Sequence, residues 1–298
     1  MKKYLLYIIL FFAVVASIDF CFGKVMDFMS RNAKSGDTKA RNSLLFDKEY
    51  DILIMGSSRA HHHYDDKMLS DSLKLKVYNA GVDGNGVILA DGLYSLLSQR
   101  YTPKLVILDV EPAFDINVYK EDDNNKRYLS NLKPYFYESC INEIFASYGW
   151  QEKVKNHSGL YRYNTDCFNV VKNYVSSATI PEYGYSPSKG AMKEERETTH
   201  NGEAVVDSFK IDYITKFIHD VNNSGANLVL VASPKYGEES SKCFDAVKEI
   251  CKENNVPFWD YYTDERFQKL GYFKEPMHLN EEGAKAFSEE IIHRITEL

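Results

Sequence analysis

The chain has 298 residues, of which 44% are hydrophobic and 27% charged, and its formal net charge is −7. Such a composition is ordinary for a globular protein, and the length suits one large α/β domain or two small ones. The acidic balance and the absence of a Lys/Arg-rich block give no electrostatic basis for binding nucleic acid, so we expect no nucleic-acid partner.

The N-terminus carries the clearest compositional signal. Lys2 and Lys3 precede the apolar run YLLYIILFFAVVASIDFCFG, which only Asp19 interrupts. This length suits a single membrane-spanning helix, and the two lysines predict a cytoplasmic N-terminus with the rest of the chain on the extracytoplasmic, periplasmic side. A cleavable signal peptide is the alternative. We assign residues 1–23 to this anchor or signal and residues 24–49 to a polar juxtamembrane linker.

A strand–helix alternation begins at residue 50 and continues to the end of the chain. The predicted strands are YDILIMG, KVYNAG, PKLVILDVEP, ANLVLVASP and VPFWDY, with helical patterns between them and after the last. Nearly continuous apolar strands that alternate with helices indicate a parallel sheet covered on both faces. We predict a three-layer α/β/α sandwich over residues 50–298, with a five-stranded parallel sheet in the flavodoxin-like order 2-1-3-4-5.

Residues 114–204 interrupt this alternation. The segment is rich in Tyr, Asn, Ser and charged residues, with one helical piece near Cys140 to Trp150. We interpret it as an insertion after the third strand, at the edge of the sheet where open α/β folds bind ligands. It either shapes a substrate groove or forms a structural cap.

Two distant segments carry residues suited to nucleophilic catalysis. Ser58 follows the first strand, on a turn where the next helix directs its backbone N–H groups. Glu275 comes three residues before His278, just ahead of the last helix. A carboxylate at that spacing can orient an imidazole so that its Nε2 accepts a proton from a serine. Since the loops after the first and fifth strands open on the same edge of a parallel sheet, we expect the three residues to meet.

These segments resemble the SGNH (GDSL-like) hydrolase superfamily. The similar blocks are Gly56-Ser57-Ser58, the stretch NAGVDGNG after the second strand, and EPMHLN before the last helix. The resemblance spans about residues 51–298 without the insertion, and the anchored form is similar to bacterial envelope members that handle acyl groups on cell-surface polymers. It implies Ser58 as nucleophile, His278 as general base and Glu275 as the orienting carboxylate.

The resemblance also implies an oxyanion hole. The Ser58 N–H and the Gly84 N–H would be two donors, and Asn79 begins the block that contains Gly84. Two positions depart from the family pattern: Glu275 replaces the usual Asp, and Glu111 falls near the position of the asparagine that is the third donor. A carboxylate cannot donate to an oxyanion, so either Asn85 substitutes or the hole has fewer donors.

The run His61-His62-His63 raises the question of a metal site. Successive helical residues diverge by about 100°, and no nearby Cys or H-x-x-x-H pair completes a ligand set. We therefore expect no metal and no cofactor, with the histidines at the rim of the site or on plain surface. Arg59 either binds an anionic substrate group or braces the loop through Asp109 or Glu111.

Two functions stay open from sequence. The first is a membrane-anchored serine esterase or O-acyltransferase acting on acyl groups, acetyl above all, of a cell-surface polysaccharide or a small ester, with or without a membrane partner that supplies acyl groups. The second is a catalytically weak or inactive SGNH-fold module that binds an envelope glycan or a partner protein.

Overall fold

The computed structural model describes residues 2–119, 125–179, 181–182, 184–194 and 204–298. The chain forms two compact units. One contains residues 1–48 and 129–181, and the other contains residues 49–128 and 182–298. The second unit carries the predicted sheet and the predicted site residues.

Five strands of the second unit form one parallel sheet. β1 (Ile52–Gly56) lies between β2 (Val77–Asn79) and β3 (Leu105–Asp109), and β6 (Asn227–Ala232) and β7 (Phe258–Asp260) continue the sheet beyond β3. The order β2-β1-β3-β6-β7 confirms the predicted arrangement, with the fourth and fifth strands of the sheet being β6 and β7.

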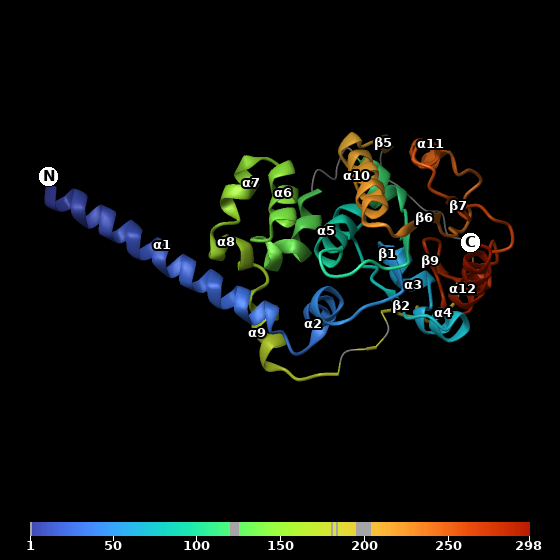
Figure 1. Cartoon of the computed structure of the whole chain (residues 1–298), viewed down its shortest axis with the longest axis horizontal. Coiled ribbons are helices and arrows are strands. Elements are labelled where there is room, and N and C mark those ends of the chain that lie inside the picture. The colour runs from blue at the N-terminus through green and yellow to red at the C-terminus, as the bar shows by residue number, and fades with distance from the viewer. Residues whose placement is uncertain (1, 120–124, 180, 183, 195–203) are drawn as a thin grey trace. The chain divides into compact units, whose positions relative to one another are not determined.

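Helices pack on both sides of this sheet (Figure 1). On one side, α4 (Asp66–Leu73) packs against α12 (Glu281–Thr296). On the other, α5 (Val87–Leu97) lies beside α10 (Ser208–Ser224). The three-layer α/β/α fold class is thus the one expected from the sequence.

Residues of β1 show why the strands are apolar throughout. Ile52 and Ile54 belong to the core that also contains Phe287 of α12. Successive side chains of a strand point to opposite faces, so Leu53 and Met55 face the α5 side. All four side chains are almost completely buried. Both faces of the strand therefore require apolar residues.

Smaller elements complete the second unit. These are α3 (Ser58–His63), α11 (Asp245–Glu253), the antiparallel pairs β4 (Asn117–Tyr119) with β5 (Ala204–Val206) and β8 (Phe273–Glu275) with β9 (His278–Leu279), a π-helical turn at Pro112–Ile116, and 3₁₀ turns at Lys242–Phe244 and Leu270–Tyr272. A further 3₁₀ segment, Asn125–Tyr135, runs from the second unit into the first.

The first unit consists of helices. Its elements are α1 (Lys2–Arg31), α2 (Gly36–Asn42), a π-helical turn at Ser43–Asp47, α6 (Ser139–Ser147), α7 (Trp150–Lys155), α8 (Gly159–Tyr163) and α9 (Cys167–Val175). α1 continues well past Gly23, into the segment expected to be a linker. Its later turns pack on α8 and α9, since a Cβ on Gly159 would lie 2.3 Å from the Gly23 Cα.

The N-terminal helix has the length and composition of a membrane span. Among the described residues, Lys2–Arg31 is the one helix that is long and apolar enough to cross a membrane. A signal sequence shares these properties. Asp19, the one charge in the apolar run, accepts hydrogen bonds from Ser158 Oγ at 2.9 Å and the Leu160 N–H at 2.7 Å. The one charged residue of the apolar run thus has hydrogen-bond partners at the start of α8.

Candidate active site

Ser58 lies where β1 ends and α3 begins. Gly56, the last residue of the strand, has a φ of +140°, and a Cβ there would lie 2.5 Å from the Asp109 carbonyl oxygen. Only glycine fits this turn. Ser57 is the N-cap, whose Oγ accepts a hydrogen bond from a backbone N–H of the first helical turn at 3.2 Å. The turn thus fixes Ser58 as the first helical residue.

Three predicted residues form a hydrogen-bonded chain. The Ser58 Oγ lies 2.7 Å from His278 Nε2, and His278 Nδ1 is hydrogen-bonded to the Glu275 carboxylate. The carboxylate also accepts a hydrogen bond from the Met277 N–H at 3.1 Å. Such a chain leaves Nε2 free to accept the serine proton, because Nδ1 carries the hydrogen that faces the carboxylate.

A small hairpin brings the carboxylate to the histidine. β8 and β9 pair in antiparallel fashion with Glu275 opposite His278. Half-burial acts to raise the pKa of Glu275, but the hydrogen bonds to His278 and the Met277 N–H outweigh it and hold that pKa below its ordinary value. Glu275 is therefore ionised at neutral pH and can stabilise a positive charge on His278.

A second histidine, His63, holds the hairpin against α3. It is buried, and burial together with the nearby Arg59 guanidinium holds its pKa well below the ordinary value, so the ring is neutral. Its Nε2 accepts a hydrogen bond from the Leu279 N–H at 3.0 Å, and its Nδ1 donates to Ser233 Oγ at 2.9 Å. The residue next to His278 is thereby tied to the helix that carries Ser58. Sequence reasoning missed this role, because nothing distinguishes His63 from its two neighbours.

The loop after β2 packs against the turn at Ser58. The Val82 N–H donates to the Gly56 carbonyl at 3.0 Å. Asn79 is buried, and its amide donates to the Ala60 and Tyr64 carbonyls at 2.7 and 3.0 Å. Both amide hydrogens are thus used, so Asn79 braces α3 in this structure.

Gly84 and Asn85 lie further along the same loop. Gly84 has a φ of +68°, the left-handed region that favours glycine. The Asn85 amide donates to the Asp83 carbonyl at 3.0 Å, which leaves one amide hydrogen. The loop ends at α5, where Asp115 accepts hydrogen bonds from the Val87 N–H at 2.6 Å and the Glu111 N–H at 2.7 Å. Asp115 therefore joins the loops that follow β2 and β3, a second role that sequence reasoning missed.

Glu111 is an acceptor in this arrangement. Its buried carboxylate accepts a hydrogen bond from Ser57 Oγ. Arg59 is completely buried, donates from Nε to Ser233 Oγ at 3.2 Å and lies over the Tyr262 ring at 5.2 Å. The buried side chains of Glu111 and Arg59 thus help to hold the turn between β1 and α3 in place.

A cavity of about 280 Å³ adjoins this turn, and its lining includes Arg59, Glu111, Pro112, Tyr262 and Met277. Arg59 and Met277, which line it, are the chain neighbours of Ser58 and His278.

Comparisons with known proteins give structural likenesses only. No family model and no curated protein matches the chain. Similar solved structures include a catalytic mutant of Axe2, an acetylxylan esterase from Geobacillus stearothermophilus (11% identity, 83% of this chain, 94% of that chain, TM-score 0.43). A putative lipolytic protein of the G-D-S-L family from Desulfitobacterium hafniense DCB-2 is also similar (10% identity, 82% of this chain, 98% of that chain, TM-score 0.39).

A third similar structure is a gut microbial diltiazem-metabolizing enzyme (12%, 83% of this chain, 47% of that chain, TM-score 0.37). At these identities and TM-scores a likeness transfers neither a substrate nor a catalytic residue to this chain.

Proposed function

We propose that this protein is a serine esterase or O-acyltransferase of the SGNH type, with Ser58, His278 and Glu275 as its catalytic triad. The observation that carries the proposal is the 2.7 Å contact between Ser58 Oγ and His278 Nε2, with the ionised Glu275 on the other side of the ring. The turn after β1 and the β8–β9 hairpin hold these groups in place before any substrate binds.

The reaction follows from this geometry. Ser58 Oγ attacks the ester carbonyl carbon while His278 Nε2 takes the hydroxyl proton. Glu275 stabilises the resulting imidazolium. His278 then returns the proton to the departing alkoxide oxygen, which leaves an acyl group on Ser58. Attack by water completes a hydrolysis, and attack by a sugar hydroxyl completes an acyl transfer.

The oxyanion that forms during attack needs donors. The Ser58 N–H at the start of α3 and the Gly84 N–H are the proposed pair, and the remaining amide hydrogen of Asn85 is a candidate third. Arg59 and Asn79 then act as positioning residues, since hydrogen bonds hold both beside the turn. Loss of one such donor typically costs about 100- to 1000-fold in rate.

We further propose that the substrate is an acylated polymer of the cell envelope, with acetyl as the acyl group. Two features support this location. The N-terminal helix is apolar enough to span a membrane, and Lys2 and Lys3 precede it. Lysines on that side favour an extracytoplasmic position for the rest of the chain.

The test is turnover of an activated acetyl ester by the detergent-solubilised full-length protein. We expect hydrolysis and labelling of Ser58 by a fluorophosphonate. Ser58→Ala and His278→Ala should each lower kcat by roughly 10⁴-fold or more. Ser72→Ala and His219→Ala, at exposed positions, are the matched controls and should retain activity. Absence of both turnover and labelling in the native protein would contradict the proposal.

One observation favours the rival function, a glycan- or protein-binding module with little catalysis. Glu111 presents a carboxylate near the position where the resemblance implies a donating asparagine. In that case Ser58→Ala would leave binding to envelope glycans and the cellular phenotype unchanged. Loss of the phenotype in a folded Ser58→Ala protein excludes this rival.

A further inference from the structure

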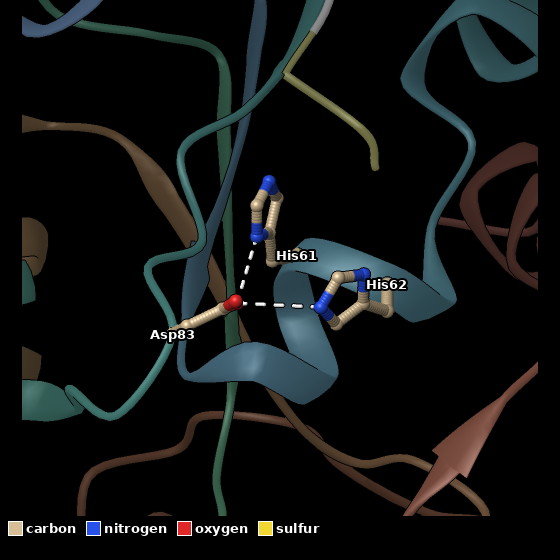
Figure 2. Close-up of side chains that lie close together, drawn as sticks. All are labelled: His61, His62 and Asp83. Carbon is tan, nitrogen blue, oxygen red and sulfur yellow. Dashed lines mark hydrogen bonds and ion pairs between the residues drawn. The ribbon is translucent and has the colours of Figure 1, made fainter. Parts of the chain in front are cut away.

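Three side chains outside the triad converge on one point. His61 and His62 lie on α3, and Asp83 lies in the loop after β2 (Figure 2). His61 Nδ1 is 2.8 Å from Asp83 Oδ1, and His62 Nε2 is 3.4 Å from the same oxygen. The two rings stack with centroids 4.7 Å apart. Adjacent histidines on a helix thus present one nitrogen each to a single carboxylate oxygen.

The hydrogen bonds of His62 show which of its ring nitrogens carries a hydrogen. Its Nδ1 lies 2.5 Å from the Ser186 carbonyl oxygen, which can only accept, so Nδ1 carries a hydrogen. A neutral ring then has its lone pair on Nε2, which faces a carboxylate oxygen that is also an acceptor. Two acceptors facing each other need a positive particle between them, either a second proton on the ring or a cation.

The surroundings of His62 suit a metal ion. Histidines that bind metals usually donate their other ring N–H to a carbonyl or carboxylate, which fixes the ring and its tautomer. The Ser186 carbonyl occupies that position here. Imidazole nitrogens with one carboxylate oxygen form a ligand set suited to Zn²⁺ and similar ions, whereas Mg²⁺ and Ca²⁺ favour oxygen ligands.

We propose that His61 Nδ1, His62 Nε2 and the Asp83 carboxylate bind a divalent transition-metal ion, with Zn²⁺ as the best fit. The three ligand atoms lie within 4.8 Å of one another. Ligands about 2.1 Å from a tetrahedral zinc ion are separated by roughly 3.4 Å, which is the distance between His62 Nε2 and Asp83 Oδ1. The shorter His61–Asp83 contact opens slightly when the ion enters.

Three protein ligands leave a fourth tetrahedral position for water or a substrate atom. Access to the group is not blocked, because the Asp83 side chain is 59% exposed and the His61 side chain 27% exposed. The group also adjoins the proposed active site. The His62 ring packs edge-to-face on His278 with centroids 5.5 Å apart, and Asp83 directly precedes Gly84. The site itself needs no esterase activity, so it stands independently of the proposed function.

The experiment measures metal binding rather than turnover. Full-length protein that lacks any polyhistidine tag is stripped with a chelator, then titrated with Zn²⁺ in competition with a chromophoric zinc indicator. Co²⁺ is the spectroscopic probe, since tetrahedral Co²⁺ has intense visible absorption. We expect one equivalent to bind and Co²⁺ to give the tetrahedral spectrum.

Variants of two of the three ligands decide the assignment. Asp83→Asn and His61→Ala should each weaken Zn²⁺ binding by roughly 100-fold or more and abolish the Co²⁺ spectrum. Both positions are partly exposed, and circular dichroism verifies that the variants fold. His219→Ala, at an exposed position on α10, is the matched control and should bind as the native protein does. Absence of stoichiometric binding to the native protein, or equal binding by all variants, would overturn the proposal.

Discussion

At the scale of single residues, the site depends on side-chain reach. Glu275 is one methylene longer than aspartate, yet its carboxylate meets both the His278 ring and the Met277 N–H. It does so because the tight β8–β9 hairpin places it opposite His278. The length of this side chain is thus matched to the hairpin, and a shorter carboxylate would draw back from the ring.

We therefore predict that Glu275→Asp lowers kcat by about 100-fold, since a shift of about 1 Å at a catalytic group has an effect of that size. Glu275→Gln keeps the length but removes the charge that stabilises the imidazolium, and should cost roughly 10⁴-fold. Steady-state kinetics with an activated acetyl ester measure both effects. Equal activity of Glu275→Asp and the native protein would show that the length of this side chain does not matter for orienting His278.

At the scale of elements, the junction between the loop after β2 and the start of α5 requires a glycine. Gly86 precedes α5, and a Cβ there would lie 2.2 Å from Asp115 Oδ1. Asp115 in turn holds the Val87 N–H. The loop that contains Gly84 therefore keeps its shape only while position 86 lacks a side chain.

Gly86→Ala should displace Asp115 and destabilise the fold by about 1–3 kcal/mol. It should also lower kcat more than 10-fold, because the Gly84 N–H, a proposed oxyanion donor, moves with the loop. Gly225→Ala is the strain-matched control. It has a φ of +85° and nothing within 4 Å of a Cβ, so it should lose stability but no activity. Urea unfolding and steady-state kinetics of both variants test this prediction. Equal loss of activity in the two variants would contradict it.

The pairing of α5 with α10 gives a pH-dependent element. Asp91 on α5 is buried and accepts hydrogen bonds from Lys216 Nζ at 2.8 and 2.9 Å. Burial raises the pKa of Asp91 to about 7, although Lys216 opposes that shift. The folded protein keeps a proton that the unfolded chain releases near pH 4, so this residue lowers stability as pH rises from about 4 to about 7.

Asp91→Asn removes that ionisation. The free energy of unfolding of the variant, relative to the native protein, should rise between about pH 5 and about pH 8. Urea unfolding at the two pH values measures the difference. Ser72→Ala, at an exposed position on α4, removes no ionisable group; it is the control and should show no comparable rise. A relative stability that is constant with pH would refute the expectation.

At the scale of the whole molecule, α1 is long and apolar enough to cross a membrane, either as an anchor or as a signal sequence. α1 presents an apolar, exposed surface through its first turns and packs on α8 and α9 through its last ones. Removing residues up to Gly23, as a signal peptidase would, would separate Asp19 from its contacts on α8. This contact favours an uncleaved anchor.

We predict that the protein stays in the membrane fraction after alkaline carbonate extraction and that its N-terminus is intact by mass spectrometry. A phosphatase fused after Leu298 should be active only if the C-terminus is extracytoplasmic, which is the orientation expected from Lys2 and Lys3. Release of a shortened soluble chain would instead identify the apolar run as a signal peptide.

The fold could be predicted from sequence because its determinants are local. Continuous apolar strands such as β1 and β3 need cover on both faces, and the alternation with helices leaves few topologies. The pairing of Ser58 with His278 was also predictable, since loops at the same edge of a parallel sheet meet. The serine turn and the Glu275–His278 spacing are both visible in the chain.

Other features depended on contacts between distant segments. The extension of α1 past Gly23 reflects its packing on α8, whose glycine lies far along the sequence. The bracing by His63 and Asp115 needs partners from distant segments, Leu279 and Val87 among them. The convergence of His61 and His62 depends on Asp83, which arrives from the next loop. Sequence by itself predicted the sheet, from its periodicity, and the meeting of Ser58, His278 and Glu275, from their places at one edge of that sheet. Only tertiary structure decided that His63 braces the hairpin whereas His61 and His62 face a shared carboxylate, because neighbouring residues of one type differ only in their partners.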